Sequence, residues 1–299
     1  KPLSTFNYQC SSIESCKPGD NDEYVEHERI SEPTENLILR RTKFTNLKDT
    51  TVEGGAILIK SSRFDCLIEE CLFEECSSKK GGALFIYYAN AKYFNLTIID
   101  TTFNKCESIS DGGAIYIENT QPLYHSMIIV RCIFKLNKAK NGGGINGKIR
   151  DQLNIEGCTF ENNEASNIGS SLYLILGYNN IKDQGEEHDS FNITDNIFKF
   201  TPTPTTNNIN VYIESQNITD DNDPSHTNVI FGGNSFSSEN EINDFKHLKV
   251  VEHHKGFETF KFIKCTCIKE DENTIEVPER FKPLSTFNYQ CSSIESCKP

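Results

Sequence analysis

Three polar stretches carry carboxylates and histidines, the side chains that most often bind metal ions or transfer protons. The first contains Asp20, Asp22 and Glu23, whose hard oxygen atoms suit calcium, although their spacing is not that of an EF-hand loop. Two further acidic stretches lie at 183–189 and 219–226. Solvated acidic loops explain all three more simply. The sequence therefore predicts no catalytic residue and no cofactor, with calcium at the first stretch left open.

The 12 cysteines are spaced for disulfide bonds rather than for a structural zinc site. Relative to a recurring phenylalanine, Cys76 and Cys106 lie three residues after it, and Cys132 and Cys158 lie two residues before it. If neighbouring phenylalanines stack in successive turns of a coil, the Cα atoms of each pair lie ~4.8 Å apart, which suits a disulfide. The alternative is a buried ladder of free thiols.

The remaining cysteines are assigned by proximity. Cys66 and Cys71 are left to each other as a third pair. A further set could join one module to the next, and it comprises Cys265, Cys267, Cys291 and Cys297, the last two being second copies of Cys10 and Cys16.

Compartment and partners follow from charge and from short motifs. Three N-glycosylation sequons begin at Asn95, Asn192 and Asn217, and together with the even number of cysteines they favour an extracellular or cell-surface location. The net charge of −13 argues against nucleic acid and anionic membranes as partners. No apolar stretch approaches the ~18 residues of a membrane-spanning helix.

The elements that position these residues are short strands that recur along the chain. Segments of the type Gly-Gly-Ala-Ile/Leu begin at Gly54, Gly81 and Gly112, and an apolar run ending in Phe stands before each. The phenylalanines recur at variable intervals of roughly 30 residues, a period typical of solenoids, and comprise Phe44, Phe73, Phe103, Phe134, Phe160, Phe198 and Phe236. Constant strands with loops of variable length predict an all-β fold, a single-stranded parallel β-helix of eight or nine turns, here called rungs.

Alternation within the strands that follow the paired glycines predicts which side chains face outward. With Ile57 and Ile59 pointing into the coil, the residue between them points out. The predicted outward column comprises Leu58, Phe85, Tyr116, Tyr173 and Tyr212. We expect either a ladder of aromatic rings that stack on one another, or an exposed apolar stripe for lateral packing or carbohydrate contact.

The glycine-led segments and Phe-x-x-Asn tetrapeptides at Phe134–Asn137 and Phe160–Asn163 resemble the repeats of the polymorphic outer-membrane proteins of chlamydiae and of similar protist surface proteins. The resemblance covers roughly residues 36–176, and Cys replaces Asn in the tetrapeptides at Phe73 and Phe103. It implies a right-handed parallel β-helix displayed outside the cell in an adhesive or structural role.

A longer repeat is also present, since residues 1–18 and 282–299 are identical, so that Lys282 repeats Lys1 and positions 1–281 form one period. This predicts a tandem array, with 36–267 as the β-helix module, 1–35 and 268–299 as junction segments, and 282–299 as the start of the next copy. The predicted function is that of a non-enzymatic structural module that stacks end to end into a filament, stalk or fibre, with identical modules as partners and with lateral homotypic contacts possible. The alternatives are an adhesin that binds glycans or host cells and a polysaccharide lyase or hydrolase, for which clustered acids would line a groove.

Overall fold

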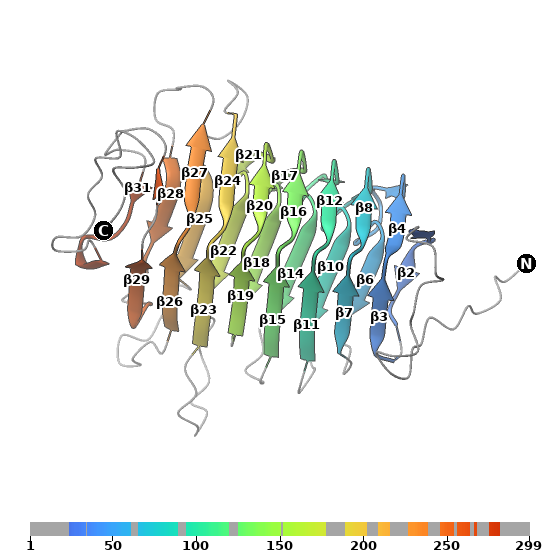
Figure 1. Cartoon of the computed structure of the whole chain (residues 1–299), viewed down its shortest axis with the longest axis horizontal. Helices are drawn as coiled ribbons and strands as arrows, with labels where there is room; N and C mark the ends of the chain where they lie inside the picture. Colours follow the sequence, from blue (N-terminus) through green and yellow to red (C-terminus); the bar gives the residue numbers. More distant parts are fainter. Residues whose placement is uncertain are drawn as a thin grey trace, which may run out of the picture.

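The computed structural model of the 299-residue chain describes residues 24–33, 35–60, 65–88, 94–119, 125–150, 152–177, 189–201, 209–215, 227–238, 246–253, 256–263, 266–267 and 275–281. In this part of the chain, strands stack along the longest axis of the molecule, with the first strands at one end and the last at the other (Figure 1). All pairings between the described strands are parallel, so the expected parallel β-helix is confirmed.

Each full rung contributes a strand to three long sheets, and several rungs add a strand to a fourth. Sheet A comprises β1 (Val25–Glu26), β4 (Thr42–Thr45), β8 (Leu72–Glu74), β12 (Thr102–Asn104), β16 (Ile133–Lys135), β20 (Thr159–Glu161), β24 (Ile197–Phe200), β27 (Ser235–Ser238) and β30 (Thr266–Cys267). Sheet B comprises β2 (Ile30–Ser31), β6 (Ile57–Lys60), β10 (Leu84–Tyr88), β14 (Ile115–Asn119), β18 (Ile145–Ile149), β22 (Leu172–Leu176), β25 (Ile209–Ser215), β28 (Lys246–Val251) and β31 (Ile275–Glu276).

Sheet C comprises β3 (Leu37–Arg40), β7 (Cys66–Glu69), β11 (Phe94–Ile99), β15 (His125–Val130), β19 (Gln152–Glu156), β23 (Asp189–Thr194), β26 (Thr227–Gly232) and β29 (Thr259–Ile263). The short sheet D comprises β5 (Lys48–Asp49), β9 (Ser77–Ser78), β13 (Glu107–Ser108), β17 (Lys138–Asn141) and β21 (Glu164–Ile168). The chain visits the sheets in the order C, A, D and B, as β3 to β6 illustrate. Sheet D was not anticipated, because its strands are short and polar.

A column of stacked phenylalanines forms the centre of the core. The seven rings from Phe44 to Phe236 are the ones expected from the sequence, and neighbouring centroids lie 4.8–5.0 Å apart with nearly parallel planes. Histidines end the column at both sides: His27 lies 5.3 Å from Phe44, and His247 lies 5.2 Å from Phe236. Each of these phenylalanines pairs in register with that of the next rung. The number of residues between them in the sequence therefore varies only because the loops differ in length.

The corners depend on residues in the left-handed region of φ. Between sheets C and A this residue is Arg41, Glu70, Asp100, Arg131, Gly157, Asp195 or Gly233, and between sheets A and D it is Asn46, Glu75, Lys105, Leu136 or Asn162. Left-handed backbone is uncommon for residues other than glycine, asparagine and aspartate. Except at Asn46, where the partly buried Leu47 follows, each of these corners is followed by a buried small or polar side chain, and these side chains form the ladders described below.

Sheet B begins at a corner built from paired glycines. The first glycine has positive φ, as at Gly112 with φ 69°. The second glycine leaves no room for a side chain, since a Cβ atom on Gly113 would lie 2.1 Å from the carbonyl oxygen of Gly143 in the next rung. Glycine is therefore required there because neighbouring rungs pack backbone against backbone.

The sheets extend past the 36–267 range expected for the module, because β1 and β2 precede it and β31 follows it. At the far end the chain turns at the 3-10 helix η3 (Glu279–Phe281). The ring of Phe281 packs 6.1 Å from Phe257 and 5.9 Å from Phe260, and Arg280 forms an ion pair with Glu252. Phe281 therefore packs against the core of the last described rungs.

Candidate functional site

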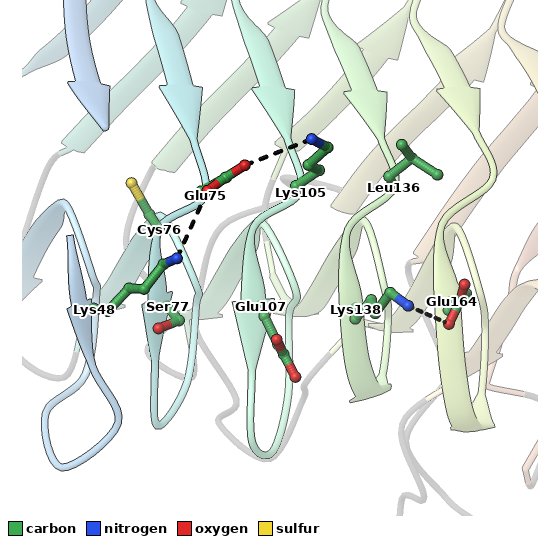
Figure 2. Close-up of a pocket in the computed structure, with 9 residues that line it drawn as sticks. All are labelled: Lys48, Glu75, Cys76, Ser77, Lys105, Glu107, Leu136, Lys138 and Glu164. Carbon is green, nitrogen blue, oxygen red and sulfur yellow. Dashed lines mark ion pairs between the residues drawn. The ribbon is translucent and has the colours of Figure 1, made fainter. Parts of the chain in front are cut away.

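A groove of about 470 Å³ runs along the corner between sheets A and D (Figure 2). Its lining comprises Lys48, Glu75, Cys76, Ser77, Lys105, Glu107, Leu136, Lys138 and Glu164. Lys48, Ser77, Glu107, Lys138 and Glu164 are stacked neighbours in sheet D. The corner residues with positive φ, such as Glu75 and Lys105, provide the opposite wall.

Ion pairs join neighbouring rungs along the groove. The Glu75 carboxylate lies 3.7 Å from the Lys48 amine and 3.5 Å from that of Lys105, and Lys138 lies 3.0 Å from Glu164. Three lysines and three glutamates line the groove, so its formal charge is zero in a chain whose net charge is −13. Exposed ion pairs of this kind individually add little to the stability of the fold. The groove is a mixed-charge surface, and small charged molecules can approach it.

Beneath the groove lies the first ladder of buried polar side chains, here called the A–D ladder. It comprises Cys76, Cys106, Asn137 and Asn163, none of which has exposed surface. The Asn137 side-chain nitrogen donates to the Phe103 carbonyl at 3.0 Å, and its side-chain oxygen accepts the Cys106 N–H at 2.8 Å. Each asparagine therefore satisfies two main-chain groups that would otherwise be buried without a partner.

The cysteines of the A–D ladder occupy the same position as the asparagines. The Cys106 thiol donates to the Phe73 carbonyl at 3.6 Å, just as the Asn137 amide donates to the carbonyl of Phe103. Cys76 bonds in the same way to the Phe44 carbonyl at 3.6 Å. In this ladder a thiol replaces an amide as a weaker donor.

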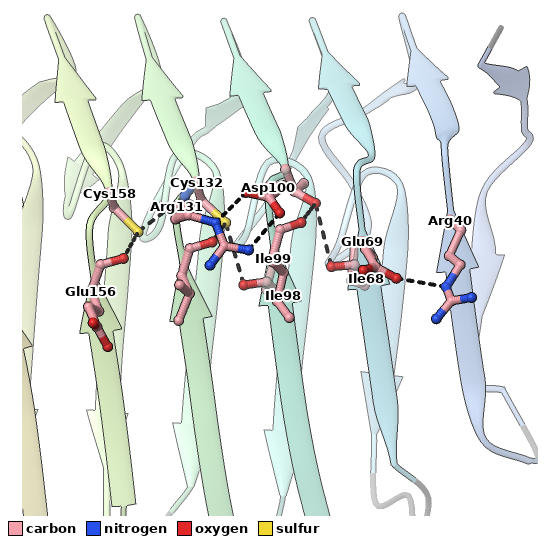
Figure 3. Close-up of polar contacts among 12 residues, drawn as sticks. Arg40, Ile68, Glu69, Ile98, Ile99, Asp100, Arg131, Cys132, Glu156 and Cys158 are labelled. Atoms are coloured by element: carbon pink, nitrogen blue, oxygen red, sulfur yellow. Dashed lines mark hydrogen bonds and ion pairs between the residues drawn. The ribbon is translucent and has the colours of Figure 1, made fainter. Parts of the chain in front are cut away.

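A second ladder, here called the C–A ladder, lies at the corner between sheets C and A (Figure 3). It comprises Thr42, Cys71, Thr101, Cys132, Cys158, Asn196 and Asn234, all of them buried. Cys132 and Cys158 donate to the carbonyls of Ile98 and Ile129, each at 3.5 Å, and Asn196 donates to that of Ile155 at 2.9 Å. Outside this ladder, a two-bond ion pair joins Arg131 to Asp100 at 2.7 and 2.8 Å.

The expected disulfide bonds are not formed in the structure. All six cysteines whose side chains are described are free, namely Cys66, Cys71, Cys76, Cys106, Cys132 and Cys158. The pairs Cys76–Cys106 and Cys132–Cys158 do occupy neighbouring rungs, but each thiol is directed to a main-chain carbonyl. The third pair does not meet, because Cys66 starts strand β7 while Cys71 lies beyond its end, in the C–A ladder.

Burial makes most of these thiols poor nucleophiles. It raises the pKa of Cys71 to about 11, and it also raises the pKa values of Cys66, Cys106 and Cys132 well above the ordinary thiol value. Cys76 differs, because the hydrogen bond from the Cys106 thiol lowers its pKa below the ordinary value. Cys76 is also the one of these six that lines the groove.

The outward column of sheet B lies outside the main core but is not an exposed stripe. Leu58, Phe85 and Tyr116 form a separate buried cluster, with the rings of Phe85 and Tyr116 stacked at 5.2 Å. The amines of Lys60 and Lys80 lie over these two rings, at 5.7 and 4.5 Å from the centroids. Of the two alternatives expected from the sequence, the stacked rings describe these residues and the exposed stripe does not, because long lysine side chains cover the apolar surface.

The column is also interrupted. Asn146 takes the place of an aromatic residue between Tyr116 and Tyr173, and the rings of Tyr173 and Tyr212 stack at 5.3 Å beyond it. Burial raises the pKa of Tyr173 to about 12, and Glu214 contributes to the shift. The column is therefore two short stacks of rings rather than one continuous ladder.

Two of the three sequons lie in described strands. Asn95 is exposed near the start of β11, and its side-chain nitrogen donates to Asp65 at 3.0 Å. Asn192 is half-buried in the middle of β23, between Asn154 and Ile230 of the neighbouring rungs. Outside the described residues are Asp20, Asp22, Glu23, Asn217, Cys265, Cys291, Cys297 and the side chain of Cys267.

Sequence reasoning missed the groove. Its charged residues come from sheet D, whose strands of two to five residues carry no apolar alternation. The available signal was the stack of alternating charges at Lys48, Glu107, Lys138 and Glu164, which becomes visible only when the rungs are aligned on their phenylalanines.

Comparisons with known proteins find no match for this chain among protein families, curated proteins or solved structures. Within the described residues, no three or more His, Cys, Asp or Glu side chains gather as a metal ion would require. The same part of the chain contains no helix with the length and apolarity needed to cross a membrane.

Proposed function

We propose that this chain is a structural repeat module that extends end to end into a rod outside the cell, and that its role is mechanical rather than catalytic. The observation that carries the proposal is the identity of residues 1–18 and 282–299 at either side of a continuous stack of parallel strands. Open ends of a β-helix carry unpaired main-chain groups, which a following rung can satisfy.

The length of the junction supports this proposal. Along sheet B, residues in register run from Ile30 to Ile275, and the steps between neighbouring rungs differ in length. Counted in residues, the step from Ile145 to Leu172 is among the shortest, and the step from Leu172 to Val211 is the longest.

Because Lys282 repeats Lys1, the equivalent of Ile30 in a following copy would stand at position 311. The step from Ile275 to that position is longer than the step from Ile145 to Leu172 and shorter than the step from Leu172 to Val211. The interval across the junction therefore has the length of one rung.

The extracellular location is part of the same proposal. It is supported by the exposed Asn95 sequon and by the resemblance of the glycine-led segments to surface-protein repeats. The partner is a further copy of the module, and the contact is made through the ends of the stack.

The test is the length of chains that contain one, two and four copies, measured by small-angle X-ray scattering. Nine strands in sheet B at ~4.8 Å predict an added length of about 43 Å per copy. A constant cross-section with this increment supports the proposal. Copies that fold back beside one another, with an increase in cross-section rather than in length, would contradict it.

A second candidate function is adhesion, and the groove between sheets A and D favours it. The groove is lined by lysines and glutamates from successive rungs and by the partly buried Leu136. Such a surface is suited to polar chains such as glycans. A glycan array probed with the full chain tests this function. Binding that disappears when Lys105 and Lys138 are changed together to Ala would support it, and binding unaffected by the change would exclude the groove.

A further inference from the structure

Two dithiols have the same geometry in this fold but different surroundings. Cys76 and Cys106 occupy neighbouring rungs of the A–D ladder, and Cys132 and Cys158 occupy neighbouring rungs of the C–A ladder. Equivalent positions in adjacent parallel strands lie ~4.8 Å apart, which is inside the range for a disulfide. Neither pair therefore needs a large backbone movement to form one.

The surroundings differ in access. Cys76 lines the groove, between Lys48 and Lys105, whereas the lining of the groove includes neither Cys132 nor Cys158 (Figures 2 and 3). Cys76 has no exposed surface in the resting structure, so a reagent reaches it only when the corner at Glu75 opens locally. The corner before Cys132 has the same backbone conformation, with Arg131 at φ 51° against φ 54° for Glu75, so the groove rather than the backbone distinguishes the two dithiols.

The surroundings also differ in charge. Lys48 and Lys105 share a single carboxylate, that of Glu75. Glu107 balances the charge of the groove as a whole, but the charged group that acts on the Cys76 thiol is the Lys48 amine. This favours an anionic reagent and also a thiolate. At the other corner the Arg131 guanidinium is occupied by the two-bond pair with Asp100.

We propose that Cys76 and Cys106 form a thiol–disulfide exchange site for small anionic disulfides that enter through the groove. The Cys76 thiolate attacks one sulfur of the reagent, a mixed disulfide forms, and the first half of the reagent leaves as a thiolate that takes up a proton. Cys106 then attacks the Cys76 sulfur and the second half leaves in the same way. The dithiol loses two electrons and two protons, and the reagent disulfide is reduced to two thiols.

The bond joins residues of neighbouring rungs and ties the two rungs together. It also removes the two thiol donors to the carbonyls of Phe44 and Phe73. Oxidation thus replaces two weak hydrogen bonds with a covalent bond between neighbouring rungs. This change does not involve the ends of the stack. The inference is independent of the proposed structural function.

The experiment uses the reduced full chain exposed to glutathione disulfide, an anionic reagent, or to cystamine, a cationic one. Samples are quenched with acid and a maleimide, and non-reducing peptide mapping with fragmentation separates Cys66, Cys71 and Cys76. We expect the Cys76–Cys106 bond to form at least about tenfold faster than Cys132–Cys158 with glutathione disulfide. Equal rates, or faster oxidation of Cys132–Cys158, would overturn the proposal.

Two sets of variants test the assigned roles. Changing Lys48 and Lys105 together to Gln should slow the reaction with glutathione disulfide but not with cystamine, whereas the matched variant Arg131→Gln should leave the Cys76–Cys106 rate unchanged. In Cys106→Ser the glutathione adduct should accumulate on Cys76, and in Cys76→Ser Cys106 should remain unmodified. An adduct on Cys106 in the second variant would overturn the order of attack. If either variant fails to fold, the rates of the unmodified chain still decide between the two dithiols.

Discussion

At the scale of single residues, thiol, amide and hydroxyl groups perform one task in the two ladders. Each follows a corner with positive φ and donates to a main-chain carbonyl, as Thr101, Cys132 and Asn196 do in the C–A ladder. The asparagine oxygen also accepts a main-chain N–H of the preceding rung, at 3.0 Å in Asn234, and the Thr101 hydroxyl does so at 3.2 Å, whereas sulfur is a weak acceptor. The asparagines therefore satisfy more of the buried main chain than the cysteines do.

This difference predicts the cost of substitutions at Asn137. Asn137→Ala leaves the Phe103 carbonyl and the Cys106 N–H without their partner, so we expect a loss of about 2–4 kcal/mol in the free energy of unfolding. Asn137→Cys keeps a donor and should lose about half as much. Urea denaturation measures both, with the exposed Asn167→Ala as a control expected within about 0.5 kcal/mol. Equal losses for Ala and Cys at Asn137 would show that the thiol does not replace the amide.

His247 predicts a response to acid. Its side chain is buried against Phe236, and burial lowers its pKa from 6.5 to about 4. The folded state therefore binds fewer protons than the unfolded state, and stability present above pH 6.5 is lost as the pH falls toward 4, by up to about 3 kcal/mol. His247→Phe lacks the titrating group.

Urea denaturation of the original chain and of His247→Phe at pH 7.5, 5.5 and 4.5 checks this prediction. Carboxylates that titrate in the same range affect both proteins equally, so their effect cancels in the comparison. The difference in unfolding free energy between the variant and the original chain should grow as the pH falls. A difference that stays constant with pH would exclude His247 as the source.

At the scale of elements, the glycine corner is the least tolerant part of each rung. Gly113→Ala would put a Cβ atom 2.1 Å from the Gly143 oxygen, and the backbone there has no room to yield. We expect a loss of about 3 kcal/mol or more, seen as a large drop in the urea midpoint or as failure to fold.

The matched control is Gly157→Asp at the corner between sheets C and A. Gly157 has φ 61°, and its nearest neighbour to an added Cβ would be Arg131 at 3.7 Å. Asp100 and Asp195 occupy the equivalent corner in other rungs, with φ of 49° and 56°. This variant should therefore stay within about 1 kcal/mol of the original. A similar loss in both variants would show that close packing at Gly113 does not set the cost of an added side chain.

The elements were predictable where a side chain must fill the interior. The phenylalanine series located seven rungs of sheet A, and the paired glycines located the starts of sheet B, because both positions tolerate little else. The other corners gave no signal, since Glu75, Lys105 and Leu136 are not residues that usually adopt positive φ. Packing against the neighbouring rungs imposes positive φ on these residues. The sequence of a single rung therefore does not reveal it.

The candidate site was predictable only in part, for a related reason. The alignment on phenylalanine placed Cys76 beside Cys106 and Cys132 beside Cys158, but it did not reveal the main-chain carbonyls to which the thiols donate. The outward column of sheet B was placed correctly outside the core, while its burial depends on Lys60 and Lys80, whose side chains come from other positions.

At the scale of the whole molecule, stacking predicts cooperativity between copies. If rungs continue across the junction, the thermal midpoint should rise from one copy to two and four, because each added interface stabilises its neighbours. Differential scanning calorimetry measures this. The control replaces residues 282–299 with a Gly/Ser linker of equal length, which should return the midpoint to that of a single copy. Midpoints that do not change with copy number would contradict continuous stacking.

The direction of the hydrogen bonds has a mechanical consequence. Bonds between rungs run along the axis of the stack, and β1 and β31 lie at its two ends (Figure 1). Tension applied between these ends would load the bonds a few at a time, as in unzipping, and not all together in shear. Each rung of roughly 30 residues would release on the order of 100 Å of extended chain when it peels away. Such a rod would be extensible and would lengthen one rung at a time at low force. A disulfide bond between two rungs would shorten that extension by a fixed amount.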